Sequence, residues 1–520
     1  MKTHRKSWRS VFASVFKYIL LVLICILLAV AISGKYAARW YKKTFGVTIR
    51  EIIYTMNSPL KGADTGFLGK AVSYCIPGII LSAVLIAMIL VWEIAVVRRV
   101  HIHWNLGLRG HRKVSINLTY VRRGITLALA IAMVISTFSY ADRTLKISDY
   151  IDSMAHQTKI YENEYVDPND VDITVQSGQK KNLIYIYMES METTYASKAD
   201  GGYQPVNNYM PNLTELASQN INFTNKMDGR LGGWHSLDGT GWTMGALFST
   251  TSGVPFSFST DGNSMNERKK FASGITTLGD ILEKQGYNQE FLCGSDAEFA
   301  GRKEYFHQHG NYKVFDYNTA VEKGYIPEGR VVWWGFEDEY LYQIARDEVT
   351  QLASENKPFN LTMLTVDTHH VDGYVCDLCE NQYPEQLANV VSCADRQAYD
   401  FVQWCEAQPF FANTQIIISG DHPRMDNDLV DGVSYYDRTV YNCFISADET
   451  KQANTEGREF AAMDMFPSIL SFLGYDIQGD RLGLGTNLFS NKKTLMEQYG
   501  YKKLSKELSR YSQYYIDKFS

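Results

Sequence analysis

Residues 183–190 read LIYIYMES, and this stretch decides the fold. The five apolar residues over 183–187, isoleucine and tyrosine among them, lead directly into Met188 and Glu189. The length and residue types of this run favour a buried strand over a helix. Residues 361–366 and 415–418 form two more runs of the same kind. Helix-like stretches lie between the runs. The alternation predicts an α/β fold with a mostly parallel sheet and helices on both faces. The helix-like stretches are 275–285, 340–354 and 393–407.

Acidic and histidine side chains follow each predicted strand. Glu189 ends the first run, His369 follows the second, and Asp421 and His422 follow the third. Because parallel strands present their carboxyl ends at one edge of a sheet, we expect these side chains to converge there. Mixed oxygen and nitrogen ligands suit a divalent cation, although any one such residue is more often a helix cap or a surface charge than a ligand. Together they predict a metal site.

The loop DGTGWTMG over 238–245 is a second candidate element, because it precedes an apolar run. This pattern is typical of a loop that enters a helix, where free backbone N–H groups bind an anion. Thr243 lies at that position. A threonine hydroxyl becomes a nucleophile only beside a base or a metal, and the alternative is that Thr243 merely caps the helix.

These motifs together resemble the phosphoglycerol transferase branch of the alkaline phosphatase/sulfatase superfamily. That branch includes the lipoteichoic acid synthases and the transferases that decorate periplasmic glucans. The resemblance covers residues 180–490, and GTGWT and TVDTHH bring it closer to the glucan-decorating type. It implies a sulfatase-like catalytic domain over 181–490. The motifs are the run over 183–190, GTGWTMGALFSTTSGVP over 239–255, FAGR over 299–302, TVDTHH over 365–370 and SGDH over 419–422.

The resemblance implies a nucleophile and a metal site. Thr243 matches the residue that becomes a glycerophospho-threonine. Glu189, Asp421 and His422 match the ligands of one Mn²⁺, with Mg²⁺ as the alternative, and Thr243 matches the fourth ligand.

The resemblance also implies a substrate-binding side of the site. His369 matches a histidine that contacts the phosphate or passes a proton, and Arg302 matches an arginine that holds the glycerol phosphate group. Phe299 and Asp296 belong to the same substrate-binding segment. Ala300 stands where the synthases have a tryptophan, so headgroup recognition differs from theirs at this point.

The implied activity is transfer of glycerol phosphate from phosphatidylglycerol to a glycan or glycerol phosphate polymer. A phosphoethanolamine transferase, a phosphodiesterase that passes the same intermediate to water, and an inactive membrane sensor are the alternatives. A binding module needs no nucleophile, so a threonine set among predicted metal ligands favours an enzyme.

The charge of the chain divides sharply near residue 141. Residues 1–141 hold 19 Lys and Arg and three acidic residues, whereas 142–520 hold 32 basic and 54 acidic residues. An acidic rear part repels phosphate backbones, which excludes nucleic acid as its partner. Residues 1–141 therefore form a separate part of the chain.

Three apolar runs predict a transmembrane anchor over residues 1–141, with spans over about 14–33, 74–97 and 124–141. A cleaved signal peptide is the alternative for the first run. The excess of Lys and Arg predicts a multi-pass protein of the cell membrane with its N-terminus inside and its catalytic domain extracytoplasmic. We expect a linker over 142–180 and a helical tail over 491–520.

Five of the eight cysteines crowd one stretch of the predicted exterior part. Cys376, Cys379 and Cys393 favour a disulfide in an oxidising compartment. A zinc clip, which needs four ligands at close spacing, is the competing interpretation. Spacing alone leaves the pairing open, with Cys405 and Cys443 as further partners.

Overall fold

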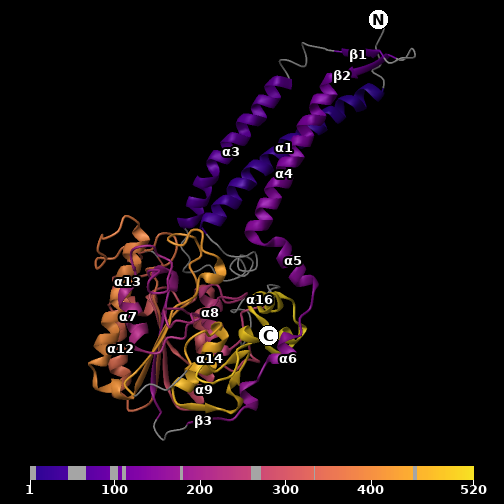
Figure 1. The fold of residues 1–520 in the computed structure, drawn as a ribbon. Helices are drawn as coiled ribbons and strands as arrows, with labels where there is room; N and C mark the ends of the chain where they lie inside the picture. Colours follow the sequence, from indigo (N-terminus) through magenta and orange to yellow (C-terminus); the bar gives the residue numbers. More distant parts are fainter. Residues whose placement is uncertain are drawn as a thin grey trace. The chain divides into compact units, whose positions relative to one another are not determined.

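The computed structural model describes residues 8–44, 66–93, 103–107, 113–175, 180–258, 271–332, 334–448 and 454–519. Within them the chain forms two compact units, which divide between Ser148 and Asp149. Figure 1 traces both units along the chain.

The first unit consists of three long helices and one hairpin. The helices are α1 (Trp8–Thr44), α3 (Gly66–Trp92) and α4 (Leu118–Leu145), and the hairpin pairs β1 (His103–Gly107) with β2 (Lys113–Asn117). Each helix is long and apolar enough to cross a membrane. The apolar segments cover Tyr18–Tyr41, Gly69–Trp92 and Val121–Leu145. The first two are shifted by several residues from the predicted spans over 14–33 and 74–97, and the third extends past both ends of the predicted span over 124–141.

Small and polar side chains join these helices. Thr137 of α4 donates a hydrogen bond to the carbonyl of Ala31 in α1 at 2.8 Å. Gly78 of α3 lies against Tyr36, where a Cβ atom would come within 2.6 Å of the ring. Glu93, at the end of α3, forms ion pairs with Arg122 and Arg123 of α4.

The second unit is built on a six-stranded sheet. The three strands predicted from the sequence form its centre as β7 (Phe359–Leu364), β4 (Asn182–Met188) and β8 (Thr414–Gly420), all parallel. This confirms the predicted α/β fold. The order across the sheet is β6 (Lys313–Phe315), β5 (Asn288–Cys293), β7, β4, β8 and β9 (Asn442–Ser446), with only β9 antiparallel to its neighbour.

Both faces of the sheet are covered, so that β4 is buried along its whole length. Its side chains alternate between two hydrophobic cores: Tyr185 and Tyr187 face one, Ile184 and Ile186 the other. Burial on both faces explains the unbroken apolar run. The first core takes in α8 (Thr243–Ser252), α9 (Leu278–Lys284) and α14 (Ala462–Phe472), and the second α7 (Pro211–Gln219), α12 (Asp338–Ser354) and α13 (Gln386–Glu406).

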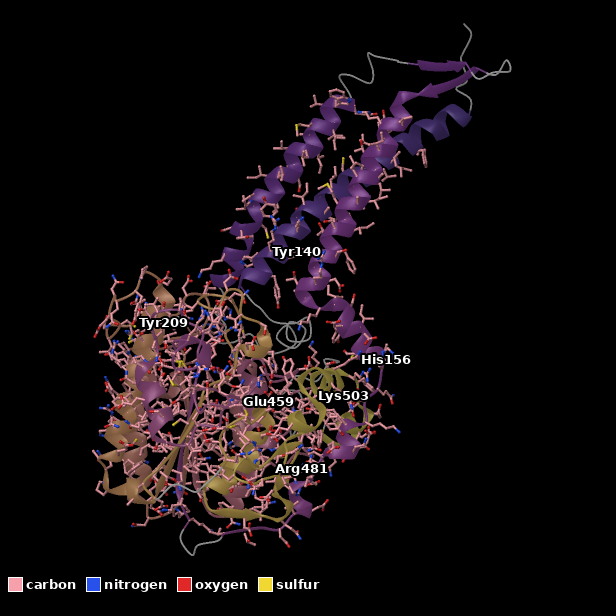
Figure 2. The ribbon with its side chains drawn as sticks, viewed as in Figure 1. Tyr140, His156, Tyr209, Glu459, Arg481 and Lys503 are labelled. Carbon is pink, nitrogen blue, oxygen red and sulfur yellow. The ribbon has the colours of Figure 1, made fainter. Side chains whose placement is uncertain are left out.

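The predicted linker over 142–180 is largely folded. Two of its apolar side chains, Ile160 and Tyr161, are buried in the first core, which a free linker would not achieve. Arg481, labelled in Figure 2, pairs with Glu164 at 3.2 Å. The segment forms α5 (Ile147–Ala155), α6 (Ile160–Glu164) and β3 (Ile173–Val175), and β3 pairs with β10 (Tyr475–Ile477).

The predicted helical tail forms three short helices that complete the first core. Leu504, Leu508, Tyr515 and Phe519 are all buried there. The three helices are α15 (Leu495–Tyr499), α16 (Tyr501–Ser509) and α17 (Gln513–Phe519).

The second unit also contains two short helices and a two-stranded pair: α10 (Arg302–Gln308), α11 (Tyr317–Glu322), and β11 (Arg481–Leu482) with β12 (Gly485–Thr486).

The disulfide favoured from the sequence is not formed. All eight cysteines, each in a described part of the chain, carry free thiols. Cys376, Cys379 and Cys393 do come together, with the sulfur of Cys376 at 3.6 and 3.7 Å from the other two. A disulfide requires about 2.05 Å. Cys405 and Cys443 lie outside this group.

Tyr187 joins the central strand to helix α8, because its hydroxyl lies 2.6 Å from Thr250 Oγ1 in the buried core. We expect Tyr187→Phe to lower the free energy of unfolding by about 1 kcal/mol, the usual net value of one buried hydrogen bond. Urea unfolding of the detergent-solubilised chain measures this loss. Tyr511→Phe, which removes a hydroxyl bonded to exposed Gln513, is the matched control. Equal losses in both variants would contradict the assignment.

Candidate active site

Glu189 and Asp421 are brought together by the sheet itself. Glu189 follows β4 and Asp421 follows β8, and the two strands are paired up to Met188 and Gly420. Both carboxylates and His422 are buried. One ligand atom from each of the three residues lies within 4.8 Å of the others, so the predicted convergence at the sheet edge is confirmed.

Ser190 orients both carboxylates. Its N–H donates to Asp421 Oδ1 at 2.7 Å, and its hydroxyl donates to Glu189 Oε1 at 2.6 Å. Both bonds depend on a left-handed backbone, with φ of +53°, which is unusual for serine. Sequence reasoning missed this role, since a serine after a strand carries no sign of its backbone conformation.

The imidazole of His422 presents a lone pair to Thr243. Its Nδ1 lies 2.8 Å from the carbonyl oxygen of Pro423. A carbonyl only accepts hydrogen bonds, so Nδ1 carries the proton and Nε2 the lone pair. Nε2 lies 3.3 Å from Thr243 Oγ1 and 3.6 Å from Glu189 Oε1.

Thr243 is the first residue of α8, and its Oγ1 lies 3.3 Å from Glu189 Oε2. Trp242, the N-cap residue, gives the helix no side-chain hydrogen bond, so the first-turn N–H groups are available to an anion. Gly245 allows the loop to close over the helix, because a Cβ atom there would come within 2.5 Å of Trp242 Nε1. The site therefore pairs a hydroxyl with an anion-binding helix end.

The donor set fits a divalent cation. Asp421 Oδ2 is buried and has no hydrogen-bond partner among the described residues. Burial and, after it, the negative charge of Glu189 raise the pKa of Asp421 to about 7. Two carboxylates, an imidazole lone pair and a hydroxyl match the ligand preferences of Mn²⁺ and Mg²⁺.

His369 faces the same pocket as the predicted nucleophile. Its Nδ1 lies 2.7 Å from the carbonyl oxygen of His370, which leaves the lone pair on Nε2. Burial lowers the pKa of His369, so the neutral base form is favoured. The pocket is lined by Glu189, Thr243, Phe299, Arg302, Trp334 and His369, among others.

Arg302, at the start of α10, is fixed by the loop before it. Its Nε donates to the carbonyl of Phe299 at 3.2 Å, and its Nη2 donates to Ser295 Oγ at 3.0 Å and to the carbonyl of Asp296 at 2.9 Å. Asp296 thus holds Arg302 through its backbone carbonyl, while its carboxylate accepts a hydrogen bond from the N–H of Glu298 at 2.9 Å. The structure places Arg302 and Phe299 at the pocket and Asp296 behind Arg302.

This fold and this strand-end site define the alkaline phosphatase superfamily. Within it the chain belongs to the sulfatase family, whose model, described as Sulfatase, matches residues 181–475.

The chain is also similar to named transferases. It is 32% identical over 320 residues to phosphoglycerol transferase I of Xanthomonas campestris pv. campestris (strain B100), a match over 60% of this chain and 43% of that protein. It is 27% identical over 451 residues to phosphoglycerol transferase I of Salmonella choleraesuis (strain SC-B67), over 85% of this chain and 53% of that protein. The chain thus spans about half the length of these relatives.

Two solved structures are similar as well. The lipoteichoic acid synthase LtaP from Listeria monocytogenes is 19% identical with a TM-score of 0.48, over 63% of this chain and 81% of that one. The lipooligosaccharide phosphoethanolamine transferase EptA from Neisseria meningitidis is 12% identical with a TM-score of 0.48, over 88% of this chain and 84% of that one.

Ser190 offers a test of how the carboxylates are held. We expect Ser190→Ala to lower Mn²⁺ affinity about ten- to a hundredfold, the usual cost of losing a group that orients a metal ligand. Titration calorimetry of the full chain measures the affinity without any turnover. Ser218→Ala, on an exposed position of α7, is the control and should leave the affinity unchanged. An unchanged affinity in Ser190→Ala would exclude the orienting role.

Proposed function

We propose that the protein is a membrane-anchored phosphoglycerol transferase that moves glycerol phosphate from phosphatidylglycerol to a glycan or polyglycerol phosphate acceptor. The observation that supports this proposal most directly is the position of Thr243 at the start of a helix. Its Oγ1 lies 3.3 Å from both Glu189 Oε2 and His422 Nε2. The similarity to phosphoglycerol transferases I supports the choice of headgroup.

In the first step Thr243 Oγ forms a bond to the lipid phosphorus, and the bond from phosphorus to diacylglycerol oxygen breaks. The Thr243 hydroxyl gives up one proton and the departing diacylglycerol takes one up, so the step is balanced. Glu189, Asp421 and His422 would hold Mn²⁺ or Mg²⁺, which would supply Lewis-acid stabilisation of charge on the phosphate oxygens. The first-turn N–H groups of α8 bind the same oxygens.

In the second step an acceptor hydroxyl attacks the phospho-threonine, and the bond from phosphorus to Thr243 oxygen breaks. His369 Nε2 takes the acceptor proton, and the Thr243 oxygen regains one. Arg302 holds the glycerol phosphate through both steps. The three apolar helices keep the site at the membrane that contains the lipid, with the N-terminus inside and the catalytic unit outside.

The nucleophile is tested by intact mass. We incubate the detergent-solubilised full chain with phosphatidylglycerol and Mn²⁺, and expect a mass gain of one glycerophosphoryl group, absent in Thr243→Ala. Thr350→Ala, the same substitution at an exposed helix position, should keep the adduct. An adduct in Thr243→Ala would exclude Thr243 as the nucleophile.

The same assay separates the alternatives. Release of glycerol phosphate without an adduct and without acceptor transfer would indicate a phosphodiesterase. An adduct formed only with phosphatidylethanolamine would indicate a phosphoethanolamine transferase. Mn²⁺ binding with no turnover of either lipid would indicate a sensor.

Arg302 is tested by a conservative change. Arg302→Lys keeps the charge but loses the planar fork, so we expect KM for phosphatidylglycerol to rise about tenfold or more, the cost of one charged hydrogen bond. The exposed Arg230→Lys is the matched control. A fall in kcat alone, with KM unchanged, would contradict a role in headgroup binding.

A further inference from the structure

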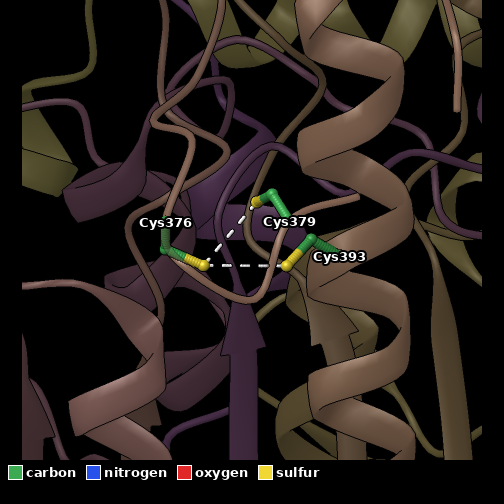
Figure 3. Close-up of side chains that lie close together, drawn as sticks. All are labelled: Cys376, Cys379 and Cys393. Atoms are coloured by element: carbon green, nitrogen blue, oxygen red, sulfur yellow. Dashed lines mark hydrogen bonds between the residues drawn. The ribbon is translucent and has the colours of Figure 1, made fainter. Parts of the chain in front are cut away.

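Three cysteines form a cluster that the proposed reaction does not use. Cys376 and Cys379 lie in the loop after β7, and Cys393 lies on α13, as Figure 3 shows. The sulfur of Cys376 lies 3.6 Å from that of Cys379 and 3.7 Å from that of Cys393, and all three sulfurs lie within 4.8 Å of one another. Cys376 and Cys393 are buried, whereas Cys379 is partly exposed and gives the cluster access to solvent.

The separation of the sulfurs matches the corners of one coordination tetrahedron. Zinc binds thiolate sulfur at about 2.3 Å with tetrahedral geometry, which sets the sulfur-to-sulfur distance at about 3.7 Å. The two measured distances, 3.6 and 3.7 Å, agree with this value.

Gln397 lies beside two of the three sulfurs. It lies one helical turn beyond Cys393 and is only 9% exposed. Its amide nitrogen lies 3.4 Å from the sulfur of Cys393 and 3.9 Å from that of Cys376. Its amide oxygen is buried without a hydrogen-bond partner among the described residues. A half-turn of the amide exchanges the two atoms and places the oxygen close to the sulfur-to-oxygen distance of about 3.6 Å in a zinc tetrahedron.

We propose that Cys376, Cys379 and Cys393 bind one Zn²⁺, with the amide oxygen of Gln397 as the fourth ligand. Three soft sulfur ligands select zinc, whereas the oxygen-rich site at Glu189 suits Mn²⁺ or Mg²⁺, so the two sites hold different ions.

The zinc would fasten the loop that begins at His369 to α13. Within that loop the N–H of Gly373 donates to the carbonyl of His369 at 3.2 Å, and the N–H of Tyr374 donates to the carbonyl of Asp367 at 2.7 Å. The chain therefore folds back on His369 before it reaches Cys376. A zinc ion at the cysteines would therefore fix one end of this loop to α13, and the other end of the loop carries His369, the predicted base.

The test uses the full chain in detergent, loaded with Co²⁺ as a coloured substitute for Zn²⁺. We expect one equivalent of cobalt with thiolate-to-cobalt charge-transfer absorption, lost in Cys393→Ser and in Cys379→Ser. Cys405→Ser, a second buried cysteine of α13, is the matched control and should keep the band. Glu189→Gln should also keep it, because no sulfur belongs to that site. Gln397→Ala should lower the affinity about tenfold while the band remains.

A count of thiols completes the test. The zinc-free, denatured and unreduced chain should yield all eight thiols to alkylation. Six thiols and no charge-transfer band would show a disulfide in place of the ion and overturn the proposal. A band that persists in both Cys393→Ser and Cys379→Ser would overturn it as well. Since Cys379 is partly exposed, its serine variant tests the site even where Cys393→Ser does not fold.

Discussion

The repulsion between two buried carboxylates is the constraint on which the catalytic unit depends. The pairing of β4 with β8 places Glu189 beside Asp421, because each residue directly follows its strand. Ser190 offsets part of the repulsion by donating a hydrogen bond to each carboxylate, and its backbone adopts a left-handed conformation that makes both bonds possible. The divalent cation of the proposed function would balance the remaining charge. The arrangement of Thr243 and His422 around the same oxygens follows from this requirement.

Buried ion pairs support the carboxylates from behind and connect all three strand-end loops. Glu192, after β4, accepts hydrogen bonds from Arg438 at 2.5 and 2.9 Å and from the backbone N–H of Arg424, after β8. Arg424 in turn donates to the carbonyl of Thr368, after β7, and pairs with Asp426 at 2.6 Å. Removing one partner of such a pair costs about 3–5 kcal/mol, so the three loops form one rigid base under the pocket.

The sequence predicted the sheet well and the fine geometry poorly. Unbroken apolar runs mark strands buried on both faces, so β4 and the position of Glu189 could be predicted from residue types alone. The left-handed backbone of Ser190 and the placement of Asp296 behind Arg302 could not, because neighbouring loops determine both. The thiol cluster was predicted in part. The three cysteines were grouped correctly, but whether they form a disulfide depends on distances between their sulfur atoms, which the spacing of cysteines along the sequence does not determine.

The pairing of β3 with β10 has a consequence for how the protein is made. Residues 173–175 pair with 475–477, and the N–H of Thr158 donates a hydrogen bond to the carbonyl of Tyr511. The opening segment of the unit therefore finds its partners only after some three hundred further residues have been synthesised. Contacts of such long range slow folding and leave apolar strands exposed in the meantime. The opening segment of the catalytic unit can therefore complete its pairing only after residues 475–519 have been synthesised.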